Sequence, residues 1–402
     1  MASTEVIGWF ADIGLHDRPH VGGKGGSLGE LQRAGIAVPP GFVVKTGAFE
    51  RFIQALEQKA PMRARVESLN ADDLAATTAC CAELRARVEG EPLPGDVLDE
   101  ISSAYAVLCG SAGRAPVAVR SSATTEDAID ASFAGLQDTY LWVTDAEQTL
   151  QRVRSCWASL YSVESVTYRR KRGLAEDGVA MAVVVQKMVD ARTAGVMFTR
   201  SPLTGDRSVV TIEGAWGLGS AVVGGEVTPD RWVLGKITGD ISVRDISEKL
   251  IQHVPVTQGG TESVAVGDDQ RRAACMSDEE LQALRTIARK VEKHYGRPQD
   301  IEWAVEQLPG FKAGDIAAFA ITTPGGEETP AVLVQCRSSD DAERVRLREE
   351  IRERVRSVTG MNCVIELIPP RTLPRTSSGK LSRAKARNLY LNGEIKPYDI
   401  AA

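Results

Sequence analysis

The chain has 402 residues, 43% of them hydrophobic and 25% charged, and this length allows two or three domains with cores of their own. A formal net charge of −6 argues against nucleic acid as an obligate partner, because phosphate binding needs Lys and Arg clustered on one face. Seven cysteines without a CxxC pair, and no apolar run of the roughly 18 residues that span a bilayer, predict reduced thiols, no membrane segment and a cytoplasmic location.

The first 45 residues predict a loop, a short helix and a strand. A glycine-rich turn at 22–26 precedes a helix that Ser27 would cap, with Glu30 three residues later completing a capping box. The β-prone residues 42–44 follow a Pro-Pro-Gly break. Residues 46–112 are rich in Ala, Leu, Glu and Arg and predict a helical insert.

Strands are predicted at 117–120, 181–189 and 195–199. Residues 182–185 are continuously apolar, which suits a strand buried on both faces.

A long amphipathic helix is predicted over 278–295. Ser277 and Glu280 form a capping box at its start, and Gly296 ends it.

The pattern changes beyond about residue 304. Strands at 316–321 and 331–335 flank a Pro-Gly-Gly turn and predict a hairpin. An amphipathic helix at 342–358 and a strand at 363–368 follow, so we expect a small α+β domain at the C-terminal end.

Two cationic side chains stand where phosphate could bind. Lys24 lies among four glycines at a helix start, where backbone N–H groups can approach an anion. Arg120 ends a strand, and a guanidinium can clamp phosphate with two bonds, while Ser121 and Ser122 add hydroxyls. The alternatives are a surface glycine turn for Lys24, and for Arg120 a salt bridge with the acidic residues at 126 and 127.

Six motifs in order make these signals specific. Here the chain resembles the nucleotide-binding region of phosphoenolpyruvate synthase, pyruvate phosphate dikinase and rifampicin phosphotransferase. The resemblance implies an α/β (α+β) ATP-grasp fold with two subdomains around a nucleotide cleft, spanning 1–190 and 191–303. The motifs are VGGKGGSLGEL from 21, VAVRSSATTEDAIDASFAGLQDTYL (117–141), AVVVQKMV (182–189), AGVMFTRSPLTGD (194–206), EGAWGLGSAVVGGEVTPDRW (213–232) and GRPQDIEWAVE (296–306).

The resemblance implies a role for five residues at the phosphate end of ATP. Lys24 and Arg120 would bind the phosphates and act in catalysis, with Thr139 nearby. Glu302 would also act in catalysis by holding Mg²⁺, and Asp300 is a lesser candidate for the metal. The implied chemistry is consistent, because ATP cleavage needs cations at the phosphates and carboxylate oxygens on magnesium.

The resemblance also implies a nucleoside side. Gln186 and Met188 would line the adenine slot, with core packing as the alternative for both, and Glu213 would contact the nucleoside. Two residues depart from the family pattern, which often has Gln where Leu136 stands and Glu where Ser220 stands. These departures bear on substrate geometry.

Residues from about 298 to 402 resemble the small C-terminal domain of acyl-adenylate-forming enzymes, especially fatty-acyl-AMP ligases. The sharpest part is LPRTSSGKLSR at 373–383, whose Lys380 corresponds to the lysine that enters the active site of a large adenylating domain. That domain is not found in this sequence, so the alternative is a basic loop without a catalytic partner. We place the domain boundary at 303/304.

Gln335 and Arg337 are open to two interpretations. ATP-grasp relatives complete the metal and phosphate site with Gln-x-Arg on a strand soon after the DIEW strand. Here 33 positions (335 − 302) separate Glu302 from Gln335. Either an insertion separates the two parts of the site, or the strand belongs to the ligase-like domain; we favour the second.

The resemblance implies an ATP-dependent phosphotransferase of the phosphoenolpyruvate synthase type, with ATP and Mg²⁺ as cofactors and either AMP or ADP as product. Full-length relatives continue into a swivelling domain with a phosphoryl-accepting histidine, but no histidine follows His294 here. We therefore expect an acceptor in trans, which is either a phosphohistidine domain or a small molecule.

Two further functions stay open. The chain could be an ATP-grasp ligase that activates a carboxylate as an acyl phosphate, with the C-terminal domain presenting substrate or a carrier protein. It could also be a non-catalytic ATP-binding accessory subunit whose partner supplies an adenylating domain.

Overall fold

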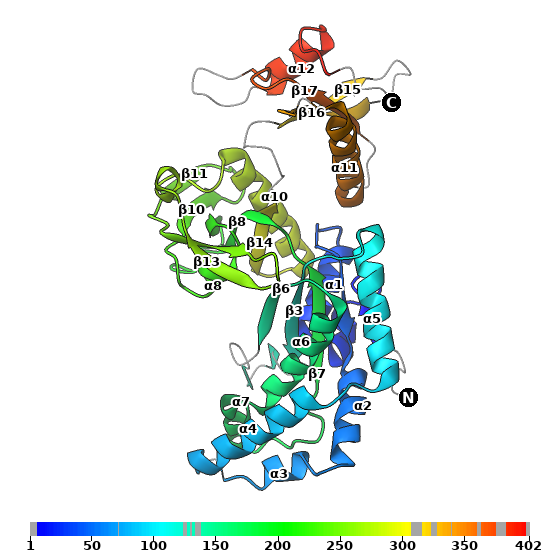
Figure 1. The fold of residues 1–402 in the computed structure, drawn as a ribbon. Coiled ribbons are helices and arrows are strands. Elements are labelled where there is room, and N and C mark those ends of the chain that lie inside the picture. Colours follow the sequence, from blue (N-terminus) through cyan, green and yellow to red (C-terminus); the bar gives the residue numbers. More distant parts are fainter. Residues whose placement is uncertain are drawn as a thin grey trace. The chain divides into compact units, whose positions relative to one another are not determined.

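A computed structural model gives the fold of the chain (Figure 1). The structure describes residues 6–70, 72–123, 127, 128, 131, 132, 138–306, 316–322, 328–338, 340–359, 363–374 and 383–398. The chain divides into two compact units, Met1–Glu306 and Gln307–Ala402. Among the described residues, no helix is both long enough and apolar enough to span a membrane.

The first sheet of the larger unit has five strands, and each pairs antiparallel with its neighbours. In spatial order they are β1 (Ile7–Trp9), β2 (Gly41–Val44), β7 (Met181–Lys187), β3 (Val117–Ala123) and β6 (Thr139–Val143). Residues 182–185 of the central strand are fully buried, which confirms the prediction of a strand covered on both faces. A two-stranded ribbon, β4 (Asp127–Ala128) and β5 (Ala131–Ser132), follows β3.

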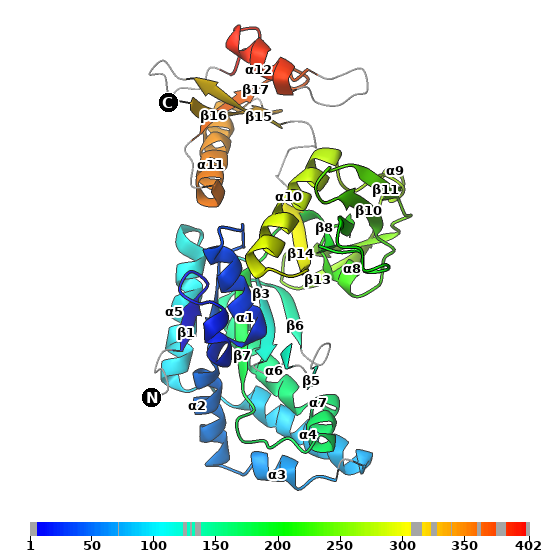
Figure 2. The ribbon, with the colours of Figure 1, turned by 180° about the vertical axis from the view of Figure 1, so that it is seen from behind.

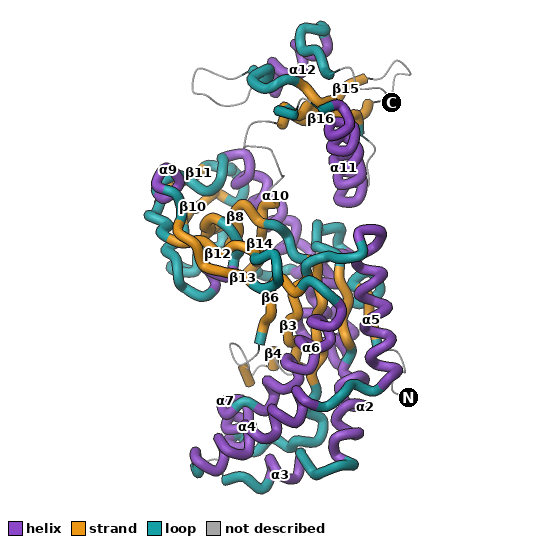
Figure 3. The backbone as a smooth tube through the Cα atoms, viewed as in Figure 1, coloured by secondary structure: helices purple, strands orange, loops and turns teal. Residues whose placement is uncertain are grey.

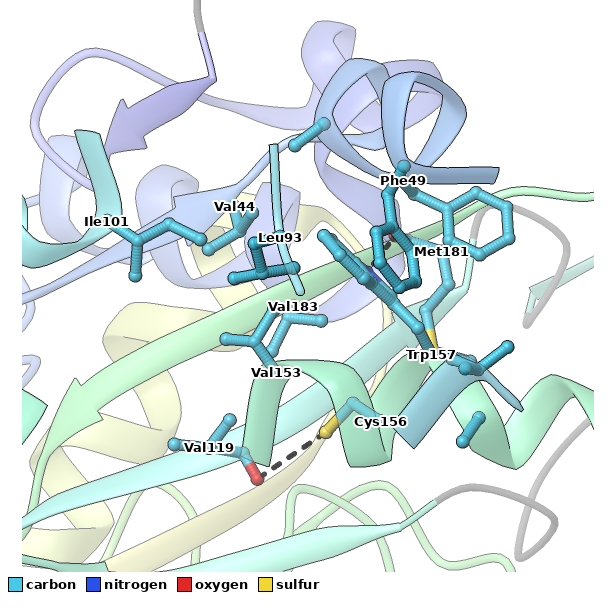
Figure 4. Packing of buried hydrophobic residues seen from close by; sticks show 14 of the residues in the cluster. Val44, Phe49, Leu93, Ile101, Val119, Val153, Cys156, Trp157, Met181 and Val183 are labelled. Carbon is cyan, nitrogen blue, oxygen red and sulfur yellow. Dashed lines mark hydrogen bonds between the residues drawn. The ribbon is translucent and has the colours of Figure 1, made fainter. Parts of the chain in front are cut away.

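One hydrophobic core joins this sheet to most of its helices, and the helical prediction for 46–112 is confirmed. In Figure 4, Trp157 packs beside Phe49 with ring centroids 5.8 Å apart, and its indole nitrogen donates to the Met181 carbonyl oxygen at 3.2 Å. The helices are α2 (Thr46–Glu57), α3 (Arg63–Glu67), α4 (Leu74–Gly90), α5 (Gly95–Cys109), α6 (Ala146–Ala158) and α7 (Val163–Lys171), with short 3₁₀ turns η1 (Leu15–Asp17), η2 (Gly110–Ala112) and η3 (Ser159–Tyr161).

Helix α1 (Arg18–Arg33) covers the opposite face of the sheet, as Figure 2 shows from behind. The expected helix start at Ser27 is wrong, because α1 already begins at Arg18 and runs through the glycines with one interruption at Gly22. The glycines serve close packing rather than a loop. A Cβ on Gly25 would come within 2.9 Å of the Val43 side chain, so only glycine lets this helix lie so near the sheet.

The second sheet of the larger unit also has five antiparallel strands (Figure 3). Helix α10 (Asp278–Tyr295) packs on one face through a core that includes Trp232 and Trp303. Its predicted capping box at Ser277 and its predicted end at Gly296 are confirmed, and Gly296 adopts the left-handed conformation. In spatial order the strands are β11 (Ile241–Asp245), β10 (Asp230–Gly235), β9 (Val209–Trp216), β8 (Ala191–Phe198) and β14 (Asp300–Glu306).

A hairpin, β12 (Ile251–Pro255) and β13 (Thr261–Ala265), lies outside this sheet, with the short helices α8 (Ser220–Val223) and α9 (Asp268–Arg271) beside it in sequence. Its tip reaches the first sheet, where Gly260 N donates to the Trp142 carbonyl oxygen of β6 at 2.9 Å.

The smaller unit contains a three-stranded sheet. β16 (Glu328–Gln335) pairs antiparallel with β15 (Ile316–Thr322) and parallel with β17 (Val364–Ile368). The predicted hairpin, helix and strand are confirmed, the helix as α11 (Asp341–Thr359). A last helix, α12 (Arg383–Leu391), packs on the same sheet.

Candidate active site

The end of β3 holds the glycine segment of α1 in place. Ser122 Oγ donates to the carbonyl oxygen of Val21 at 2.9 Å and accepts from Gly25 N at 3.2 Å. Gly22 lies against the same serine, since a Cβ on Gly22 would come within 2.2 Å of the Ser122 carbonyl oxygen. Ser122 is fully buried, so its hydroxyl positions the glycine segment instead of facing a ligand as the sequence suggested.

Lys24 directly precedes the glycine that bonds to Ser122, so this docking places the lysine beside the end of β3. Its side chain is half-buried. The charge of Lys24 also reaches α6, where burial raises the pKa of the Cys156 thiol while the positive charges of Arg152 and Lys24 act in the opposite direction.

Arg120 links the two sheets of the larger unit. Its Nη2 donates to Glu302 Oε2 of β14 at 3.0 Å, and the two side chains are 24% and 58% exposed. The salt bridges considered from sequence involve the side chains of Glu126 and Asp127, which lie outside the described part of the structure. Thr139 is the cross-strand neighbour of Arg120 on β6. An ion pair this exposed contributes about 0–1 kcal/mol, so a bound anion can replace it at little cost.

Glu302 belongs to a row of side chains across the second sheet. Val196 of β8 pairs with Glu302 on one side and with Glu213 on the other, and Glu213 pairs with Arg231. Directly paired residues of antiparallel strands share a face, so the two carboxylates stand on one face about 10 Å apart, two strand spacings. Asp300, two residues before Glu302, shares that face.

The carboxylates of Asp300 and Glu302 are both exposed and fit a magnesium ion that arrives with nucleotide. Mg²⁺ is commonly held by one or two carboxylates plus phosphate oxygens rather than by an all-protein cage. The part of the chain that the structure describes contains no group of three His, Cys, Asp or Glu placed to hold a metal.

The segment between β7 and β8 joins the two sheets through a small apolar cluster. Gln186 is buried and its Nε2 donates to the Pro39 carbonyl oxygen at 3.1 Å, which fits the core-packing interpretation of this residue. Met188 is half-buried and packs in the cluster. We call this set the hinge cluster; it consists of the buried Ala191, Ala194 and Leu218 and the half-buried Trp142, Met188 and Val189.

Gln335 and Arg337 lie in the smaller unit. Gln335 is buried, and its Oε1 accepts from Leu373 N at 3.1 Å, a bond within that unit's own core. Arg337 is exposed at the end of β16. Lys380 and Leu136 lie outside the described residues.

Trp142 was not among the residues predicted for the site. It has a φ of 56°, and the register between β3 and β6 shifts at this point, which marks a β-bulge. No local sequence signal announces a bulge that carries tryptophan, because such positions usually hold glycine.

Comparisons with known proteins show what the chain is similar to. The family "Pyruvate phosphate dikinase, AMP/ATP-binding domain" matches residues 18–353. A probable phosphoenolpyruvate synthase of Methanocaldococcus jannaschii is 40% identical over 307 residues, covering 76% of this chain and 26% of that protein. A phosphoenolpyruvate synthase of Pyrococcus furiosus is 36% identical over 363 residues, covering 80% of this chain and 44% of that protein.

A rifampicin phosphotransferase of a Streptomyces species is 40% identical over 305 residues, covering 76% of this chain and 35% of that protein. The chain thus spans less than half the length of these curated relatives. A solved structure of fatty acyl-adenylate ligases from E. coli and L. pneumophila matches 52% of this chain and 34% of its own, at 19% identity and a TM-score of 0.21. A TM-score this low does not support an inference about fold or function, so the ligase-like resemblance of the smaller unit stays a prediction.

Proposed function

The chain belongs to the pyruvate phosphate dikinase AMP/ATP-binding domain family, and from this membership we propose that it transfers a phosphoryl group from ATP to an acceptor in trans. The observation that carries the proposal is the meeting of Arg120 and Glu302 at 3.0 Å, beside the docked glycine segment of Lys24. This contact supports the proposal because it brings the candidate phosphate clamp and the candidate metal-binding carboxylate together.

In this mechanism Arg120 exchanges its carboxylate partner for the phosphates of ATP. The guanidinium can bind two phosphate oxygens at once, and Lys24 adds a second positive charge from the docked helix. Both charges would orient the terminal phosphates and stabilise the negative charge that is spread over them during transfer. Thr139, the cross-strand neighbour of Arg120 on β6, would add a supporting hydrogen bond.

Glu302, released from Arg120, would hold Mg²⁺ together with Asp300 on the same strand face. Magnesium supplies charge neutralisation at the phosphates. Glu213, in the same row and about two strand spacings away, would contact the nucleoside. Met188 would line the adenine slot, while Gln186 would support the slot through its bond to Pro39.

The acceptor would be either a phosphohistidine domain of a partner or a small molecule. Gln335 and Arg337 would belong to the smaller unit rather than complete the ATP site, since Gln335 is bonded inside that unit. In the ligase alternative, that unit would present a substrate or carrier protein.

Isothermal titration calorimetry with Mg·ATP tests the proposal on the whole chain. We expect wild type to bind, and Arg120→Ala and Lys24→Ala to lose affinity roughly tenfold or more, since a charge-assisted hydrogen bond contributes about 1.5–3 kcal/mol. Arg65→Ala is a matched control, because Arg65 forms an exposed ion pair with Glu83 on unrelated helices. Absence of ATP binding by wild type would refute the proposal.

Product analysis then separates the chemistry. AMP with phosphate would indicate dikinase chemistry, and ADP that forms only with an added carboxylate and amine would indicate a ligase. Binding without any turnover, with or without cell extract, would indicate an accessory subunit.

A further inference from the structure

Trp142 is held in a backbone conformation that a bulky residue rarely adopts. Its φ of 56° lies in the left-handed region, where the Cβ of an L residue meets the following carbonyl oxygen. Strain of this kind persists only where the surroundings enforce it, and it concentrates at binding sites. The bulge in β6 is the local cause, because bulges redirect a side chain away from the pleat of its strand.

The redirected side chain packs against residues of the other sheet. Trp142 belongs to β6 of the first sheet, yet it lies in the hinge cluster with Leu218, which follows β9, and with Met188 of the connecting segment. An aromatic ring and a methionine thus share one apolar surface at the junction of the two sheets. The indole is only half-buried, so part of it stays open to a ligand.

The β12–β13 hairpin fixes both sides of this surface. At its base, the His253 carbonyl oxygen accepts from Leu218 N at 2.9 Å, and His253 Nδ1 lies 2.8 Å from the Ser220 hydroxyl. At its tip, Gly260 N donates to the Trp142 carbonyl oxygen at 2.9 Å. Figure 1 shows β13 passing next to β6 at this point. The hairpin therefore fixes the positions of Trp142 and Leu218 relative to each other.

We propose that Trp142 is the stacking platform for the purine base of ATP, on the same apolar surface as Met188. This inference rests on the proposed function, since it extends the same nucleotide site. Flat purine rings bind well on a surface made of an aromatic face and a polarisable thioether. Base stacking on an aromatic side chain adds to affinity independently of any contact to the phosphates.

Two variants separate the ring from the backbone. Trp142→Asn removes the ring but keeps a residue that tolerates the left-handed region, so the fold should be retained. Trp142→Phe keeps a smaller ring. We expect Trp142→Asn to weaken Mg·ATP binding roughly tenfold or more, the usual loss when a stacking side chain is removed, and Trp142→Phe to stay within a fewfold of wild type.

Tripolyphosphate is the ligand control, because it carries the phosphates and no base. Its affinity, measured by competition with Mg·ATP, should be the same in wild type and Trp142→Asn. A purely structural role would weaken both ligands alike and would overturn the inference, as would Trp142→Asn binding ATP as tightly as wild type. If wild type binds neither ligand, the proposed function fails instead.

Tryptophan fluorescence gives a second measurement that does not depend on the asparagine variant. ATP, but not tripolyphosphate, should change the emission of wild type, and most of that change should be absent from Trp142→Phe. An ATP-induced change of equal size in both proteins would place the base away from residue 142 and overturn the inference.

Discussion

Replacing Gly22 with alanine tests how tightly the glycine segment docks on β3. Gly22 has a φ of 71° and a ψ of 178°, and holding a side chain in this region costs about 1–3 kcal/mol. The new Cβ would also meet the Ser122 carbonyl oxygen at 2.2 Å and its hydroxyl at 2.3 Å. Overpacking of this kind typically costs about 1–3 kcal/mol. Together the two effects should lower the free energy of unfolding by about 2–6 kcal/mol.

Two other glycines serve as matched controls in urea unfolding followed by tryptophan fluorescence. Gly178 has a φ of 86° but nothing within 4 Å of a built Cβ, so its alanine variant carries strain alone, about 1–2 kcal/mol. Gly90 has neither strain nor neighbours, and Gly90→Ala should lie within about 1 kcal/mol of wild type. If Gly22→Ala proves no less stable than Gly178→Ala at an equal m-value, the close approach to Ser122 is not present in solution.

Three other perturbations address buried charge, pH and thiol reactivity. Glu176→Gln leaves the buried guanidinium of Arg169 without its carboxylate, so we expect the free energy of unfolding in urea to fall by about 3–5 kcal/mol. The control Glu83→Gln, at an exposed ion pair, should lower it by less than about 1 kcal/mol. Equal losses in the two variants would contradict this expectation. A hydrogen bond from His294 of α10 lowers the pKa of Glu30 in the folded protein. The stabilisation of the fold by this hydrogen bond is therefore complete above pH 4.5 and is lost as the pH falls through the lower pKa of the folded state. The thermal midpoint of Glu30→Gln should therefore fall less steeply below that pH, and parallel curves would refute the link. Burial raises the pKa of Cys81 to about 11, so mass spectrometry should find it unmodified by iodoacetamide near pH 8 until the protein is unfolded; modification of the native protein would contradict its burial.

Local signals in the sequence located α10, α11 and the buried strand β7, because capping and periodicity depend on residues a few positions apart. No element was predicted between residues 200 and 277, where β9 to β13 form. The capping box before α10 and the buried run at 182–185 are examples. The start of α1 was wrong for the opposite reason. Its glycines look like a turn, and only the approach of β2 and β3 explains why a helix there needs residues without side chains.

The candidate site was predictable in its residue types and not in its contacts. Arg120 and Glu302 were each expected near phosphate, but nothing local indicates that residues so far apart in the chain meet directly. The role of Ser122 depends on two bonds to α1, and the role proposed for Trp142 depends on a bulge and a distant hairpin. All of these are tertiary relationships, which a single sequence encodes without a local pattern.

The chain passes between the two sheets of the larger unit only once. Every strand of the first sheet ends by residue 187, and every strand of the second begins at 191 or later. Each half has a hydrophobic core of its own. Swinging one half against the other therefore requires new dihedral angles in a tether of a few residues and leaves the two cores intact, while the Arg120–Glu302 pair and the Gly260–Trp142 bond would have to break. A protease cut in that tether would leave two folded pieces that still contact each other through the Arg120–Glu302 pair and the hairpin bond to Trp142.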